Sequence, residues 1–114
     1  MLKYNNKIIA SKIIYCDSFV RQGSGLMFRN KNAVKSCAWI FRFKNPRRVT
    51  ITMFFVFFPI DIIFLDANKK IIELKKDFQP FKNYTSIAKM TTFIELESGV
   101  IEKYSLKKGM VLNF

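Results

Sequence analysis

Residues 37–44, Cys-Ala-Trp-Ile-Phe-Arg-Phe-Lys, are the stretch that indicates the fold most clearly. Every second position carries a large apolar or sulfur-containing side chain, and this period of two is typical of a strand with one buried face. Asn45-Pro46 predicts a turn directly after it. Residues 49–53 repeat the alternation, and residues 53–58 are apolar on both faces. The second stretch therefore predicts a strand that runs into a two-sided core.

Further strands are predicted by short segments rich in β-branched and aromatic residues: 7–15, 60–65, 69–74, 88–96 and 111–114. Pro59 marks a strand end, and Asp66–Asn68 predicts a hairpin turn. Residues 77–86 are expected to form a loop, and short helices are expected at 19–28 and 99–104. No alternation of strands and helices is present. The sequence predicts one mainly β domain, residues 1–114, folded as an antiparallel β-sandwich or barrel with two or three short helices.

Composition narrows the class of protein. Half of the 114 residues are hydrophobic and 13 are Phe, which is enough to build one core. With no His and only Cys16 and Cys37, the chain cannot form a standard zinc site, and we expect no metal or cofactor. The longest apolar run, residues 51–65, is interrupted and too short to span a bilayer as a helix. Since the first ten residues also lack a secretory signal, we expect a soluble, cytoplasmic protein.

The net charge of +12 is concentrated in the first half, where residues 1–60 carry 11 Lys or Arg and one acid. Arg42, Lys44, Arg47 and Arg48 follow one another beside aromatic residues. Such a cluster predicts weak, salt-sensitive binding to a polyanion, either nucleic acid or an anionic membrane surface. A solvated basic surface is the favoured alternative, because no base-reading motif accompanies the charges.

Three charged residues lie in apolar surroundings: Arg29, Asp61 and Glu95. Because an isolated buried charge is costly, we predict that Arg29 forms an ion pair with at least one of the two acids. Other interpretations stay open. Asp61 could accept backbone N–H bonds at a bulge, the three side chains could line a ligand site, or the two acids could act as the acid/base pair of a hydrolase. Cys37 shares a face with Trp39, which predicts an inert core thiol.

Three stretches resemble one known family. Residues 25–29, Gly-Leu-Met-Phe-Arg, are similar to its early Gly-Leu-Met-x-Arg signature. Residues 53–66 match its central block, in which an apolar run precedes a Pro, an Asp, an apolar strand and a second Asp. Residues 94–99, Ile-Glu-Leu-Glu-Ser-Gly, resemble its late Leu-Glu-Leu-x-x-Gly element, and Gly109 follows. In this order the stretches resemble the domain of unknown function 192 family.

The resemblance implies a compact, roughly jelly-roll-like β-sandwich and carries no established activity. The chain departs from the family at residues 54–56, where Phe-Phe-Val replaces Lys-Asn-Thr, and at Met110, where the family often has an acid. Both changes remove polar groups.

Our leading hypothesis is a non-enzymatic domain that binds a small ligand or a protein partner at a pocket or rim of the sandwich. Gly25, Met27 and Met53 are the candidate pocket-lining residues, and Arg29, Asp61 and Glu95 form the candidate polar cluster. No catalytic residue is assigned. Nucleic-acid binding through the basic half is the first alternative, and a carboxylate-based hydrolase is the second.

Overall fold

The computed structural model describes residues 1–16 and 29–114. Its strands are β1 (Leu2–Tyr4), β2 (Lys7–Ala10), β3 (Lys12–Tyr15), β4 (Cys37–Arg47), β5 (Thr50–Thr52), β6 (Ile60–Leu65), β7 (Ile71–Phe78), β8 (Asn83–Thr85) and β9 (Met90–Glu97). The 3₁₀ turn η1 (Lys31–Ala33) and the helix α2 (Val100–Lys103) complete the described elements. The predicted fold class, mainly β and sandwich-like with short helices, is confirmed.

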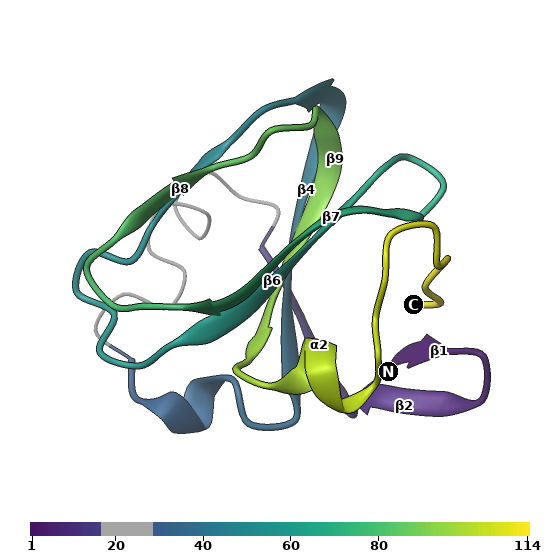
Figure 1. The fold of residues 1–114 in the computed structure, drawn as a ribbon. Coiled ribbons are helices and arrows are strands. Elements are labelled where there is room, and N and C mark those ends of the chain that lie inside the picture. The colour runs from purple at the N-terminus through teal and green to yellow at the C-terminus, as the bar shows by residue number, and fades with distance from the viewer. Residues whose placement is uncertain (17–28) are drawn as a thin grey trace.

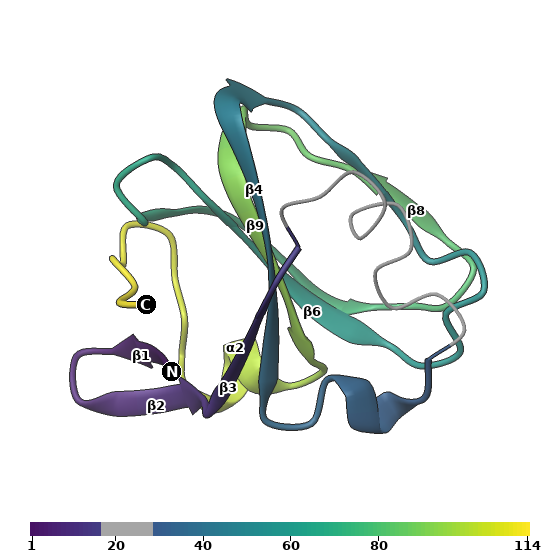
Figure 2. The same cartoon turned by 180° about the vertical axis from the view of Figure 1, so that it is seen from behind.

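A five-stranded sheet in the order β3-β4-β9-β6-β7 is the central layer of the molecule (Figure 1). Its pairs are antiparallel except for β3 and β4, which run parallel at one edge. The two-stranded ribbon β5–β8 covers one face, while the β1–β2 hairpin, α2 and the C-terminal segment cover the other (Figure 2). Both faces of the sheet are therefore buried.

The two faces form two cores. The first core, under the β5–β8 ribbon, contains the apolar side chains on one face of β4, β6 and β9, and the rings of Phe41 and Phe93 stack there with centroids 4.5 Å apart. The second core, under β1–β2 and α2, contains Ile40, Ile63 and Ile94 from the opposite face. Because alternate side chains of one strand enter different cores, all six residues of β6 are buried.

The predicted strand 7–15 is interrupted at Ser11. β2 pairs with β1, whereas β3 pairs with β4, so the chain changes sheets between them. The N–H groups of Ser11 and Lys12 both donate to the carbonyl of Ser36, which fixes this change of direction. The turn predicted at Asn45-Pro46 is also wrong, because both residues lie inside β4 where its register with β9 is irregular. A proline lacks the N–H that a regular ladder requires and is tolerated at such a place.

Residues 53–58 do not continue a strand, contrary to the prediction. β5 ends at Thr52, and the N–H of Val56 donates to the carbonyl of Met53 to close a turn. The expected loop 77–86 contains β8, which pairs with β5. Residues 111–114 form isolated bridges to Lys3 and Lys70 in place of the predicted edge strand. The helix predicted at 19–28 lies outside the described residues.

Within residues 1–16 and 29–114, no helix has the length and apolar character needed to cross a membrane.

Candidate functional site

Asp61 is buried in β6, and its carboxylate binds backbone amides from two other segments. Oδ1 accepts the N–H of Asp77 at 2.8 Å, and Oδ2 accepts the N–H groups of Gly99 at 3.1 Å and Ile101 at 2.9 Å. The register between β6 and β7 shifts beside Asp61, as expected for a bulge. Gly99 has a φ of 96°, a left-handed conformation that suits glycine, directly before α2. The carboxylate thus joins the bulge in β7 to the start of α2.

Glu95 faces the opposite side of the sheet from Asp61. In β9 it lies opposite Trp39 of β4 and Ile62 of β6, whereas Asp61 lies opposite Leu96. Neighbouring residues of a strand point to opposite faces, so the sheet separates the two carboxyl groups. This geometry does not support the acid/base pair of a hydrolase, which requires both carboxyl groups on one side of a bound substrate.

The carboxyl group of Glu95 lies in the first core, and the residue is 7% exposed. Burial raises its pKa to about 8, since the charged form loses its hydration there. Glu95 is therefore mainly protonated at neutral pH and presents an uncharged carboxylic acid. A nearby cation would lower the pKa, so the direction of the shift argues against an ion pair with Arg29.

Arg29 contacts the indole of Trp39. Its guanidinium carbon lies 4.9 Å from the ring centroid, in cation–π geometry, and the indole N–H donates to the carbonyl of Ala33 at 2.8 Å. The structure thus brings Arg29 and Glu95 to the same tryptophan and places Asp61 on the other face. For Asp61 the structure shows backbone N–H donors, one of the interpretations that the sequence left open.

A third buried acid, Glu73 of β7, was missed by the sequence analysis. Its carboxylate accepts the hydroxyl of Tyr84 and, at 2.9 Å each, the N–H groups of Ile87 and Ala88. Burial, reinforced by the hydrogen bond and charge of Glu73, raises the pKa of Tyr84 to about 12. The strand alternation offered no signal for it, because the register between β6 and β7 shifts here: Glu73 pairs with Phe64 of the first core, whereas Ile71, two residues earlier, enters the second core.

The four candidate polyanion-contacting residues, Arg42, Lys44, Arg47 and Arg48, are all exposed. The guanidinium of Arg42 lies 4.4 Å from the ring of Tyr15, and that of Arg47 lies 5.0 Å from the ring of Phe43. The Nε–H of Arg48 donates to the carbonyl of Ser86 at 2.9 Å. These contacts hold the side chains against their own domain and leave their charges accessible to solvent.

Of the three candidate pocket-lining residues, Gly25 and Met27 lie outside the described residues. Met53 is buried in the first core, where its side chain fills space between the sheet and the ribbon. Cys37 is buried in the same core, and burial raises the pKa of its thiol. A raised pKa disfavours the reactive thiolate, in line with an inert thiol.

Four phenylalanines form what we call the aromatic surface: Phe54, Phe55, Phe57 and Phe81. They are 54%, 39%, 60% and 51% exposed, respectively. The ring centroids of Phe54 and Phe55 are 5.1 Å apart, and those of Phe57 and Phe81 are 5.3 Å apart, in edge-to-face geometry. Further edge contacts join Phe54 and Phe55 to Phe81 at 6.2 and 6.4 Å. The four rings are therefore contiguous.

The backbone of Met53 holds the two loops that carry this surface. Its carbonyl accepts the N–H of Phe81 at 2.9 Å, and its N–H donates to the carbonyl of Lys82 at 2.8 Å. Phe55 and Phe81 have φ angles of 58° and 59°, in the left-handed region that bulky residues rarely adopt. Because the sequence predicts a core strand at 53–58, the exposure of Phe54, Phe55 and Phe57 could not be predicted from it.

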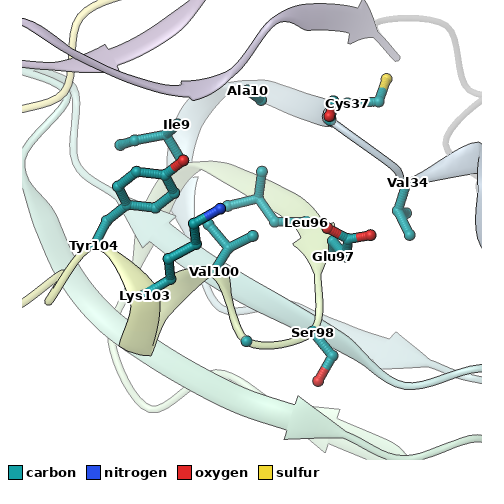
Figure 3. A pocket seen from close by; sticks show the side chains of 12 residues that line it. Ile9, Ala10, Val34, Cys37, Leu96, Glu97, Ser98, Val100, Lys103 and Tyr104 are labelled. Carbon is teal, nitrogen blue, oxygen red and sulfur yellow. The ribbon is translucent and has the colours of Figure 1, made fainter.

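A pocket of about 180 Å³ lies at the end of the sheet, where β2, β4 and β9 meet α2 (Figure 3). Lys103 of α2 and Tyr104 directly after the helix reach over it, and Cys37 and Ser98 lie on its walls. Its volume is below the roughly 300 Å³ at which small-molecule sites begin. In the described part of the chain, no three His, Cys, Asp or Glu side chains gather as metal ligands would.

Comparisons with known proteins agree with the fold. The chain is 29% identical over 105 residues to a UPF0127 protein of Pyrococcus furiosus, covering 90% of this chain and 86% of that one. It is 27% identical over 107 residues to a UPF0127 protein of Thermococcus sibiricus, covering 94% and 68%. A crystal structure of a protein of unknown function from Novosphingobium aromaticivorans superposes with a TM-score of 0.80 at 20% identity, covering 90% and 74%. The model of the family DUF192, described as Uncharacterized ACR, matches residues 2–114, and the chain belongs to this family.

Proposed function

We propose that this chain is a non-enzymatic binding domain and that the aromatic surface is its binding surface. The observation that carries the proposal is the contact of four exposed phenylalanine rings with one another on two neighbouring loops. Single exposed apolar residues are ordinary, but a contiguous apolar patch on a folded domain marks an interaction site. Catalysis is less well supported, because the carboxylates of Asp61 and Glu73 bind backbone amides and Glu95 lies on a different face from Asp61.

The backbone of the aromatic surface supports the same proposal. A left-handed φ costs a bulky residue about 1 kcal/mol or more, whereas Gly adopts it without strain. At Phe81 the chain carries a strained residue whose ring is half exposed and makes edge-to-face contacts with the other three rings of the surface. Folding alone favours Gly or Asn there, so the ring is explained better by binding than by stability.

The first test replaces Phe81 by Gly. We expect the variant to unfold within about 5 °C of the native chain, because relief of roughly 0.5–1 kcal/mol of backbone strain offsets part of the loss of a half-exposed ring. Thermal denaturation followed by circular dichroism measures the change.

Ser105→Gly is the matched control, since Ser105 is exposed and has a φ of 51°. It reports the effect of the backbone change without removal of a ring. Should Phe81→Gly lower the unfolding temperature by more than 5 °C while Ser105→Gly raises it, the ring is a structural element and the aromatic surface loses its main support.

A weak affinity for nucleic acid remains a second candidate function, supported by the exposure of Arg42, Lys44, Arg47 and Arg48. We expect micromolar or weaker binding to duplex DNA at low salt, lost as salt rises because bound phosphates release counterions. Fluorescence anisotropy with two unrelated duplexes measures it. Tight binding at 200 mM salt that differs between the duplexes would show a sequence-reading protein.

A further inference from the structure

We infer that the partner of the aromatic surface is an anionic lipid bilayer, onto which the domain docks peripherally. This inference rests on the proposed function and names the kind of partner that the surface fits. It joins two observations: the exposed phenylalanines on two adjacent loops, and the charge of the segments that carry them.

The rings are placed at one end of the β5–β8 ribbon. The last pair of the ribbon is Thr52 with Asn83, and the two loops leave the ribbon directly after it. Phe57, the most exposed of the four residues, and Phe54 have no polar group, so they gain nothing from water and can enter a hydrocarbon layer without breaking a side-chain hydrogen bond. Backbone hydrogen bonds of Met53 to both loops fix the rings before binding.

The two segments that form the ribbon and carry the rings have positively charged side chains and no negatively charged ones. The ribbon and its flanking segments, residues 47–60 and 79–89, contain four cations and no Asp or Glu: Arg47, Arg48, Lys82 and Lys89. All four cations are exposed, and Lys82 directly follows Phe81. The whole chain carries a net charge of +12. An anionic bilayer offers the complementary pair of properties, a negative surface potential and an apolar layer beneath it.

A protein partner is the competing class, and the composition of the surface favours it less. Protein interfaces concentrate their binding energy in Trp, Tyr and Arg, which combine apolar area with hydrogen bonding. This surface consists of phenylalanines alone, and the residue that directly follows Phe81 is the exposed Lys82. A bilayer accepts apolar loop residues without a matching pocket, whereas a protein partner requires one.

The test is sedimentation of the full chain with vesicles of phosphatidylcholine alone and of phosphatidylcholine with 30% phosphatidylserine. We expect the native chain to sediment with the anionic vesicles and at least tenfold less with the neutral ones at 100 mM salt. Phe54→Ser/Phe57→Ser/Phe81→Ser should weaken binding to anionic vesicles at least tenfold. Lys82→Gln should weaken it roughly fivefold and reduce its salt dependence.

The matched control is Ile8→Ser/Val111→Ser, which removes two exposed apolar side chains elsewhere on the molecule. It should bind like the native chain, and circular dichroism establishes that each variant is folded. If the native chain stays in solution with anionic vesicles, or if the phenylalanine variant binds as well as the control, the bilayer inference is overturned. A protein partner is then the remaining class. The proposed binding surface itself is tested separately, by the unfolding temperature of Phe81→Gly.

Discussion

Glu95→Gln is expected to be more stable than the native chain at pH 9 by on the order of 5 kcal/mol, and equally stable at pH 4. The reason is the buried position of the carboxyl group, which raises its pKa in the folded protein to about 8. In the unfolded chain the group titrates near 4.5. Gln keeps the shape of the protonated side chain and cannot ionise.

The direction in which stability changes with pH follows from the number of protons bound in the folded and unfolded states. Below pH 4.5 the carboxyl group is protonated in both states, so it contributes nothing to the pH dependence. Between pH 4.5 and 8 the folded state retains a proton that the unfolded state has released, and the free energy of unfolding falls by about 1.4 kcal/mol per pH unit. Above pH 8 both states are ionised and the loss stays constant. The native chain should therefore lose stability across the neutral range, and Glu95→Gln should not.

Urea denaturation at pH 4, 6, 8 and 9 measures how the free energy of unfolding depends on pH in the native chain and in Glu95→Gln. Glu97→Gln is the matched control, because Glu97 is an exposed acid two residues further along β9 and so on the same side of the strand. Its curve should run parallel to that of the native chain. Parallel curves for Glu95→Gln as well would mean that the carboxyl group of Glu95 ionises in the folded protein as it does in the unfolded one, contrary to its burial.

Asp61→Ala should lower the free energy of unfolding by about 3–5 kcal/mol, equivalent to a fall of roughly 15 °C in the unfolding temperature. The substitution leaves three backbone N–H groups, those of Asp77, Gly99 and Ile101, without their acceptor. Each unsatisfied buried donor costs about 1–3 kcal/mol. Since the same carboxylate joins β7 to α2, the covering of the second core should loosen as well.

Asp66→Ala is the control for Asp61→Ala. Asp66 also accepts two backbone N–H groups, from Asn68 and Lys70, but both bonds lie in an exposed turn where water can replace the carboxylate. Its loss should cost about 1 kcal/mol or less. An equally small effect of Asp61→Ala would show that α2 and the bulge do not depend on the carboxylate.

The pairing of Asp61 with Arg29 can be examined with a double variant. Because Asp61 and the tryptophan that Arg29 contacts lie on opposite faces of the sheet, the effects of Arg29→Ala and Asp61→Ala should add within about 0.5 kcal/mol. A combined effect well below the sum would show that Asp61 and Arg29 interact, which is one of the two pairings that the sequence allows.

Local patterns determined most of the fold. The alternation at residues 37–44 predicted β4, and the apolar run at 60–65 with its turn at Asp66 predicted β6 and the hairpin to β7. These segments were predictable because the period of the side chains is set by the strand itself and does not depend on the partner. The same reasoning identified Asp61 and Glu95 as acids in apolar surroundings, and both are buried.

Only the tertiary structure decided what those residues contact. Which face of the sheet a strand residue enters is set by its pairing, and the pairing places Asp61 and Glu95 on opposite faces although both follow an isoleucine in a similar sequence. The core strand predicted at residues 53–58 was also wrong because tertiary contacts, and not the local pattern, decide which side chains are buried. Hydrophobicity records a preference for burial, but Met53 closes a turn with Val56, and that turn exposes Phe54, Phe55 and Phe57. Composition fixed how much apolar surface the chain carries, and long-range pairing fixed which part of it faces water.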